Sequence, residues 1–226
     1  MDLHDVMTTT FAVREFTDDD VPDDVLYRIL DRARFAPSGG NRQGWKVIVV
    51  RDPTTKRRLG ELCWPAMRIA YRQMQAGEVY WQTVTPTSID TDEAAFDQDL
   101  PIVIPLFEQL DRAPVVLVVA VDLRFVASMD KDLDRIGVVS GASVYPLAWN
   151  ILLSARNEGF GGALTTLLAS AEPAAQELLG LEPHEAIAAM LPLGRPVKQL
   201  TKLSRKPVEE FVFLERAGGA PLTPPG

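Results

Sequence analysis

The possible folds of this chain are limited most strongly by one stretch, the run APVVLVVAVDL from 113 to 123. It is apolar up to Asp122, and valine is its commonest residue. A short apolar run rich in β-branched residues predicts a strand that is buried on both faces. KVIVVR at 46–51 predicts a second buried strand, IAAMLPLG at 187–194 a third strand, and EEFVFLER at 209–216 a final one.

Helical patterns fill much of the sequence between these runs. The clearest covers 22–36, where Pro22 suits the first helical position and Pro37 disfavours helix at the residue before it. Pro65 is expected to break or kink a helix predicted over 53–74. The other predicted helices cover residues 2–9, 137–158 and 173–180.

The segment 137–158 is apolar almost all the way round its helical pattern. It is not expected to span a membrane, because serine and asparagine residues interrupt it and its ends lack anchors. A helix of this kind has to be buried on every side. In a chain of 226 residues, an interface between two subunits is a natural place to bury it.

Composition excludes several classes of function. The formal net charge of −8 argues against nucleic acid or an anionic membrane as a partner, because both need a basic surface. Cys63 is the only cysteine, so no disulfide can form within the chain, and we expect it to be a buried small apolar residue. His4 and His184 are the only histidines, which disfavours a transition-metal centre. The N-terminus lacks the basic and apolar regions of a signal peptide, so a cytoplasmic location is expected.

Two segments stand apart from the predicted single domain of residues 1–216. Residues 76–110 mix aromatic residues, prolines and acids with weak periodicity, and they predict a variable lid insertion. Residues 217–226, AGGAPLTPPG, predict a flexible tail.

Two familiar ligand motifs are incomplete. GFGGAL at 159–164 has Leu164 in place of the third glycine of a dinucleotide fingerprint and follows a helix, so GFGGALTT is predicted to be a loop. DKDLDRIG at 130–137 has Arg135 in place of the glycine that a calcium loop requires. Neither motif supports a site.

Three separated segments are rich in residues that can bind a polar ligand. TTTFAVREF at 8–16 carries Arg14, APSGGNRQGW at 36–45 is rich in small hydrogen-bonding residues, and KQLTKLSRKP at 198–207 is basic. Glycine lets backbone N–H groups approach a ligand closely, and arginine can bind phosphate through two hydrogen bonds. Together the segments favour a polar, phosphorylated cofactor.

Each segment also has a simpler explanation. Arg14 could form a surface ion pair with the acids at 18–20. The glycines after Ser38 could cap the preceding helix, and Arg205 with Lys206 could protect the edge of the last strand. The functional interpretation depends on all the segments occurring in order.

That order resembles the FMN-dependent nitroreductase family. The resemblance covers residues 3–215, with 76–110 variable. It implies an α+β fold, with a central and mostly antiparallel sheet flanked by helices, in an interlocked homodimer that binds FMN between its subunits. The motifs that carry it are VREF at 13–16, VPDDVLYRILDRARFAPSGGNRQGW at 21–45, PLGRP at 192–196 and RKPVEE at 205–210.

The resemblance also implies which residues hold the cofactor. Arg14 corresponds to a basic residue at the flavin pyrimidine edge or ribityl chain, and Arg205 with Lys206 to the phosphate clamp. Residues 165–167 correspond to the backbone that passes flavin N5, although two threonines there could simply cap the next helix. The implied set is Arg14, Thr165, Thr166, Leu167, Arg205 and Lys206 from one subunit, with Pro37, Ser38, Gly39 and Asn41 from the other.

On the substrate side the candidates are Phe11, Tyr80, Trp81 and Phe107, although aromatic residues of this kind more often belong to a core. The family usually has a polar pair where this chain has Phe11 and Ala12. One phosphate or ribityl contact is therefore missing, unless the threonines at 8–10 replace it. Phe11 could instead shape the pocket.

The activity implied by the resemblance is a two-step exchange. NADPH or NADH would reduce FMN at N5, and a nitroaromatic or quinone acceptor would then take the electrons in a ping-pong mechanism. The cofactor carries this chemistry, so neither a metal nor an acid–base side chain is required. Three alternatives stay open: a flavin storage or sensor protein, a reductase for halogenated or enone substrates, and an α+β interaction domain without flavin.

Overall fold

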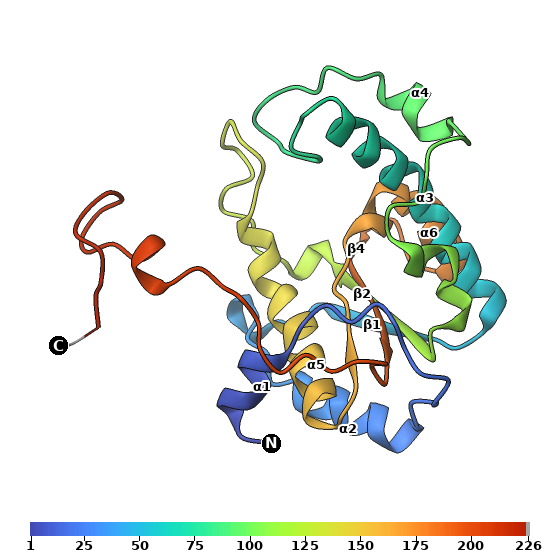
Figure 1. Ribbon diagram of the computed structural model, residues 1–226, viewed down its shortest axis with the longest axis horizontal. Helices are drawn as coiled ribbons and strands as arrows, with labels where there is room; N and C mark the ends of the chain where they lie inside the picture. Colours follow the sequence, from blue (N-terminus) through green and yellow to red (C-terminus); the bar gives the residue numbers. More distant parts are fainter. Residues whose placement is uncertain (225–226) are drawn as a thin grey trace.

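An antiparallel sheet lies at the centre of the fold, between two layers of helices (Figure 1). The computed structural model describes residues 1–224. Every pair of neighbouring strands is antiparallel. The predicted α+β fold with helices on both sides of the sheet is confirmed. In spatial order the strands are β1 (Trp45–Val50), β2 (Val115–Asp122), β4 (Glu185–Gly194) and β3 (Gly161–Gly162).

Within residues 1–224, five of the six α-helices correspond to predicted ones with differences at their ends, whereas the helix at 91–96 was not predicted. Pro22 caps α2 instead of beginning it, and α2 ends at Ala33, earlier than predicted, because the chain turns at Arg34 and Phe35. The α-helices are α1 (Leu3–Thr9), α2 (Asp23–Ala33), α3 (Pro53–Gln75), α4 (Thr91–Phe96), α5 (Tyr145–Asn157) and α6 (Glu172–Leu179).

Alternate residues of β2 enter two different cores. Leu117 and Val119 pack among the apolar residues of α2 and α5, whereas Val116 and Val118 pack among those of α3 and α6. This alternation follows from the two-residue period of a strand. Both faces of β2 are fully buried, as its sequence predicts.

β1 is an edge strand of this sheet, and β2 is its only partner among the described residues. The prediction of a strand as buried as β2 is therefore wrong for β1. Val49 is 42% exposed, while Val50 is buried against α3. Both runs are rich in valine, but the burial of a strand depends on what covers it.

Helix α3 runs through Pro65 without a break, so the predicted break is wrong and the alternative, a kink, stays a prediction. A proline removes one helical hydrogen bond and crowds the preceding turn. Burial of Leu59, Cys63 and Met67 along one face holds the helix together on either side of it. Cys63 is the buried small residue that was expected, and burial raises the pKa of its thiol to about 12.

The apolar segment 137–158 is not one buried helix. Residues Val139–Ser143 form a 3-10 turn, and α5 begins only at Tyr145. One side of α5 packs against α2 and the sheet, but Tyr145 and Trp149 are more than 40% exposed. One chain therefore does not bury this segment on every side, and its burial at a subunit interface stays a prediction.

Glycines 161 and 162 form β3, where a loop was predicted. A Cβ atom on Gly162 would lie 2.4 Å from the carbonyl oxygen of Pro192 and equally near Leu193 Cδ2. Only glycine allows the chain to come so close to β4. The motif that fails as a dinucleotide fingerprint is instead a point of close backbone packing.

The C-terminal part of the chain leaves the body as an extended arm (Figure 1). The strand predicted at 209–216 is absent: Val208–Glu210 form a 3-10 turn, and Phe213 makes a single bridge to Pro221. The apolar residues Phe211 and Leu214 are exposed, because no strand within residues 1–224 lies beside them. Residues 225–226 of the predicted tail lie outside the described part, and the boundaries of the domain and tail stay predictions.

Residues 76–110 divide into two parts. The first part is a loop followed by α4, which packs on α3 near the top of the view (Figure 1). The second part ends in two 3-10 turns that bury Leu106, Phe107 and Leu110 in the core shared with α3. The assignment of 76–110 as a lid stays a prediction.

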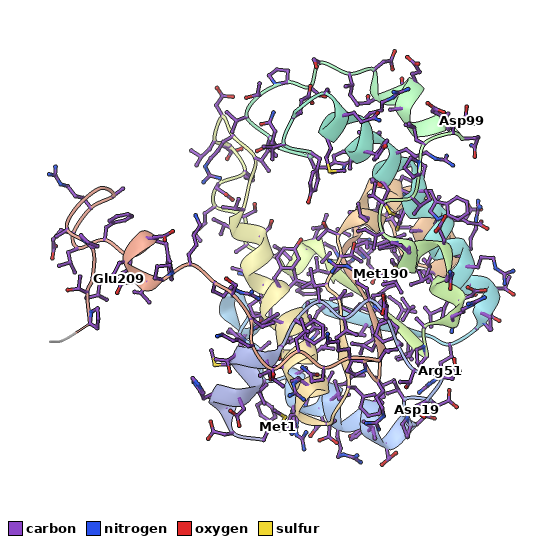
Figure 2. All side chains as sticks on the ribbon, viewed as in Figure 1. Met1, Asp19, Arg51, Asp99, Met190 and Glu209 are labelled. Atoms are coloured by element: carbon purple, nitrogen blue, oxygen red, sulfur yellow. The ribbon has the colours of Figure 1, made fainter. Side chains whose placement is uncertain are left out.

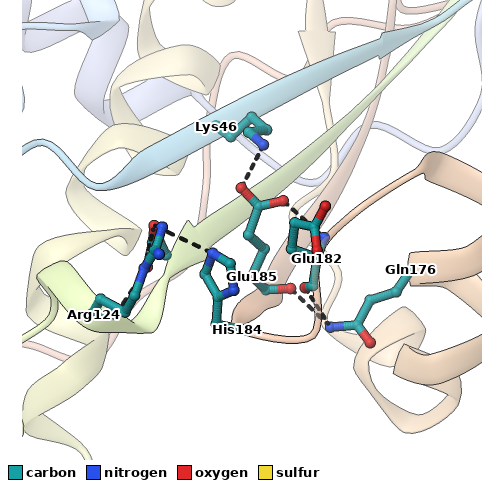
Figure 3. Close-up of polar contacts among 7 residues, drawn as sticks. Lys46, Arg124, Gln176, Glu182, His184 and Glu185 are labelled. Carbon is teal, nitrogen blue, oxygen red and sulfur yellow. Dashed lines mark hydrogen bonds and ion pairs between the residues drawn. The ribbon is translucent and has the colours of Figure 1, made fainter.

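A polar network joins the ends of three strands (Figure 3). Lys46 of β1 forms an ion pair with Glu185 of β4, and Arg124 donates to the carboxylate of Asp122 at the end of β2 over 2.6 Å. These charges lower the pKa of both carboxyl groups, that of Asp122 to about 2. The network holds the strand ends together. Its residues do not line any of the three cavities that are described below for residues 1–224.

No helix within residues 1–224 combines the length and the apolar character that crossing a bilayer demands.

Candidate functional site

A cavity of about 590 Å³ opens where the N-terminal segment, the end of β3 and residues 80–107 meet. Its volume is in the usual range for a small-molecule site. The structure brings seven of the predicted site residues to its walls. They are Arg14, Thr165, Thr166, Leu167, Tyr80, Trp81 and Phe107.

Arg14 forms one wall of the cavity. Its segment is held by backbone hydrogen bonds from Val13 N to Gly162 O (3.0 Å) and from Val197 N to Glu15 O (3.1 Å). The simpler explanation, an ion pair with the acids at 18–20, does not hold within residues 1–224: Asp19 pairs with Arg195 instead. The guanidinium of Arg14 has no carboxylate partner among these residues, so it can serve a ligand.

The backbone of residues 163–167 forms a second wall. Ala163 N donates to Pro192 O (3.4 Å), and Thr165 N donates to Met190 O (3.0 Å), so this edge is tied to β4 at every second residue. The N–H group of Leu164 lies between these bonds and that of Thr166 follows them, and neither has an acceptor within residues 1–224. Two free donors therefore belong to a stretch that lines the cavity.

The threonines of this wall have a structural role as well. Leu167 N donates to Thr165 Oγ1 (3.3 Å), which is the local capping contact expected of such a residue. Thr166 precedes the 3-10 turn Leu167–Ala171 and makes no side-chain cap to it. In this wall, the backbone groups are therefore more available to a ligand than the hydroxyl groups of the two threonines.

Aromatic residues close the cavity on the side of segment 76–110. Phe107 belongs to the core and also lines the cavity, and its role toward a substrate stays a prediction. Tyr80 and Trp81 are about half exposed at the rim. Trp81 has a left-handed backbone (φ +56°), and its N–H donates to the buried Gln73 Oε1 over 3.1 Å. Gln73 thus positions the rim, although its sequence context gave no sign of that.

Phe11 does not line this cavity. It is half buried, and Ala12 beside it forms a bridge with Gly162. Its assignment to the substrate pocket gains no support within one chain and stays a prediction.

The loop at 37–41 lies elsewhere, against the start of α5. Gly39 N donates to Ser143 Oγ over 3.2 Å, and Ser38 Oγ accepts from Gln43 N over 2.9 Å. Gly40 and Asn41 both have left-handed backbones (φ +62° and +53°). Because α2 has already ended at Ala33, these residues do not cap it, and the simpler explanation fails.

None of Pro37, Ser38, Gly39 and Asn41 reaches the cavity of the same chain. Arg205 and Lys206 do not reach it either, since they lie exposed on the arm. In Figure 2, Glu209 of the same arm lies far to the side of Met190, which marks the sheet next to the cavity wall. The roles predicted for these six residues stay predictions that need a second chain.

Sequence reasoning missed several lining residues, namely Ile104, Leu106, Ala163, Leu164, Ser170 and Pro192. Pro192 lies in the PLGRP motif, and Ile104 and Leu106 lie in an apolar run of the predicted lid, so both motifs gave a partial signal. The lining holds no acidic, histidine or cysteine side chain. Within residues 1–224, no three such residues gather where they could hold a metal ion. The cavity suits a planar, largely apolar molecule with a polar edge.

A known family model covers the part of the chain that forms these walls: residues 8–195 match the model described as the nitroreductase family. The chain belongs to the nitroreductase family. The predicted family and its general class, oxidoreductase, are thereby confirmed. The match covers the cavity walls but ends before the arm.

Curated relatives of this nitroreductase-family chain have more than one activity. A Thermus thermophilus protein named NADH dehydrogenase is 29% identical over 210 residues, which cover 89% of this chain and 90% of that protein. Human iodotyrosine deiodinase 1 is 26% identical over 215 residues, covering 93% of this chain and 68% of the deiodinase. The relatives therefore agree on the family of this chain, but they do not agree on the molecule that accepts the electrons.

Solved structures share the nitroreductase fold. A BluB-like flavoprotein from Clostridium difficile superposes with a TM-score of 0.70 at 23% identity, covering 96% of this chain and all of that one. Oxidized iodotyrosine deiodinase bound to FMN and 3-iodo-L-tyrosine gives a TM-score of 0.65 at 22% identity, with coverage of 92% and 96%. At these identities the likeness concerns the fold alone.

Proposed function

We propose that this chain is an FMN-dependent oxidoreductase that takes electrons from NADH or NADPH and passes them to a small electron-poor acceptor. The observation that supports this most is the cavity wall with two free backbone N–H groups and an arginine without a carboxylate partner. Membership of the nitroreductase family and the FMN bound to a similarly folded deiodinase point the same way.

The donor set of the cavity fits a flavin. An isoalloxazine ring has apolar faces and an edge of nitrogen and oxygen acceptors. Tyr80, Trp81 and Phe107 offer aromatic surface to such a ring, while the N–H groups of Leu164 and Thr166 offer hydrogen bonds to its edge. FMN, when bound, supplies the hydride chemistry at its N5, first accepting from a nicotinamide and then donating to an acceptor.

The residues of the chain bind, orient and shield. Arg14 stabilises negative charge at the edge of the bound ring, because a fixed cation costs no reorganisation when that charge develops. The 163–167 backbone is tied to the fully buried strand β4, so its donors keep their positions. Tyr80 and Trp81 restrict the opening and limit the entry of water.

A homodimer is part of this proposal. The loop at 37–41 and the basic pair Arg205 and Lys206 do not reach the cavity of their own chain. A second chain would supply what is missing. The exposed apolar residues of α5 and of the arm support such an interface, because a monomer rarely exposes so many. Light scattering after size exclusion tests it, and a monomer that binds FMN fully would refute the shared site.

The experiment that tests the function is an anaerobic absorbance titration. Purified protein loaded with FMN should be yellow and should bleach on addition of NADH or NADPH. A nitroaromatic, a quinone and an iodophenol, each added after bleaching, should restore the oxidised spectrum at rates that rank the acceptors. Protein that fails to retain added FMN would refute the proposal.

A flavin storage or sensor protein is the alternative that Phe11 and Ala12 keep open. The same titration separates the two functions. Reoxidation by every acceptor at no more than the rate given by air would indicate storage, whereas a faster reaction with one acceptor class indicates turnover. A cytoplasmic location stays a prediction.

A further inference from the structure

Two further cavities extend the main one into a groove. The first, of about 360 Å³, shares Arg14 and Leu106 with the main cavity. The second, of about 600 Å³, shares Asp18, Arg112 and Ala113 with the first. The three cavities therefore adjoin one another along the N-terminal segment, and we call them together the groove. It ends near the corner that Figure 2 marks with Arg51 and Asp19.

The outer part of this groove holds cations that no carboxylate neutralises. Lys56 is 4% exposed, and its Nζ donates to Ala113 O over 2.5 Å and to no other atom within residues 1–224. Burial lowers the pKa of Lys56, and the charge of Asp111, which forms its ion pair with Arg57, only partly offsets this. Within residues 1–224, the side chain of Arg112 donates only to the neutral Gln109 Oε1, over 3.0 Å.

Lys56 and Arg112 lack carboxylate partners even though the chain is rich in acidic residues. The chain carries a net charge of −8, and Asp18 and Asp20 line the same outer groove without an ion pair among residues 1–224. Only Arg51 is paired there, with Asp23 over 2.8 Å. The groove therefore offers separate cationic and carboxylate groups to whatever enters it.

A nucleotide needs both kinds of group. Arginine and lysine bind its phosphates, and a carboxylate accepts hydrogen bonds from ribose hydroxyls. We infer that the outer groove binds the adenosine monophosphate half of a reduced nicotinamide dinucleotide, with Arg112 and Lys56 as phosphate ligands and Asp18 as a ribose ligand. This inference rests on the proposed function, and it names the reductant: a carboxylate repels a 2′-phosphate, so NADH is preferred to NADPH.

Arg112→Ala tests the groove, because Arg112 is exposed and does not line the main cavity. Arg58→Ala is the matched control: Arg58 is another exposed arginine, on α3, that pairs with Glu61 and lines none of these cavities. Binding of ADP-ribose, measured by calorimetry on FMN-loaded protein, gives a readout that needs no turnover. Arg112→Ala should weaken it about tenfold, the effect of one charge-assisted hydrogen bond, while Arg58→Ala leaves it unchanged.

Steady-state kinetics give the second readout. Arg112→Ala should raise the KM for NADH about tenfold with little change in kcat, because the contact is the same in the ground and transition states. The KM for reduced nicotinamide mononucleotide, which lacks the adenosine monophosphate half, should not change. An equal loss with both reductants would overturn the inference, since the arginine would then act at the flavin.

The carboxylate has its own test. Asp18→Asn should raise kcat/KM for NADPH relative to NADH, whereas Glu177→Gln, at an exposed acid of α6, should not. Native protein that binds no ADP-ribose, or an Arg112→Ala variant that matches the native protein, overturns the groove while leaving the flavin site intact. If neither nucleotide reduces the bound FMN, the proposed function fails and the inference fails with it.

Discussion

Replacing Gly162 with alanine tests the contact between β3 and β4 that holds one wall of the candidate site. The added Cβ would lie 2.4 Å from Pro192 O and from Leu193 Cδ2, and 3.3 Å from Leu152 Cδ2. A flexible side chain could move away, but Pro192 is part of the buried strand β4 and its carbonyl cannot. Overpacking of this kind costs about 1–3 kcal/mol, and the fixed backbone contact argues for the upper end.

In a chain of this length, a loss of about 3 kcal/mol lowers the Tm by about 6–12 °C. Urea titration followed by circular dichroism should show the lower midpoint. FMN retention should fall as well, because Val13 N bonds to Gly162 O and residues 163–167 continue from it.

Gly137→Ala is the matched control. Its Cβ would meet nothing closer than Asp130 Oδ1 at 3.5 Å, and its backbone is not left-handed, so its stability should stay within about 0.5 kcal/mol of the native protein. If Gly162→Ala unfolded at the same urea concentration as Gly137→Ala, the close approach of β3 to β4 would be refuted.

Three further predictions concern a strand end, the thiol and the rim. The pKa of Asp122 is lowered to about 2, mainly by the hydrogen bond from Arg124, so this pair stabilises the fold above the ordinary value of 3.8 and ceases to do so as the pH falls through about 2. Arg124→Ala should therefore lower the urea midpoint at neutral pH, by an amount that shrinks as the pH falls from 3.8 to about 2; a constant difference would contradict the pairing. Cys63 should not react with Ellman's reagent in native protein and should react fully in concentrated guanidinium chloride, because burial keeps the thiol protonated. Gln73→Leu removes the acceptor of Trp81 N and should raise the KM for a quinone about two- to tenfold at unchanged FMN affinity; an unchanged KM would show that the rim does not depend on this bond.

The sequence predicted best what depends on local composition. The run 115–122 and the amphipathic helix α2 could be recognised because their own patterns fix their faces. Errors arose where burial depends on a neighbour. The runs 46–51 and 209–216 are apolar, yet the first lies at a sheet edge and the second lies on an arm beside no strand.

The candidate site was predicted in part for a similar reason. The family motifs pointed to Arg14 and to residues 165–167, and the structure places both at one cavity. No residue type could reveal the free N–H groups of Leu164 and Thr166, because these result from pairing with β4 at alternate positions. Gln73 was missed because its importance lies in a single contact to the backbone of Trp81.

The N-terminal segment that carries Arg14 depends on residues made much later. Val13 bonds to Gly162, Thr17 bonds to Arg195, and Glu15 accepts from Val197. During synthesis on the ribosome, these first residues emerge long before their partners exist. The segment therefore cannot dock until nearly all of the body has been translated. A nascent chain that stops before Val197 should be unable to complete the cavity.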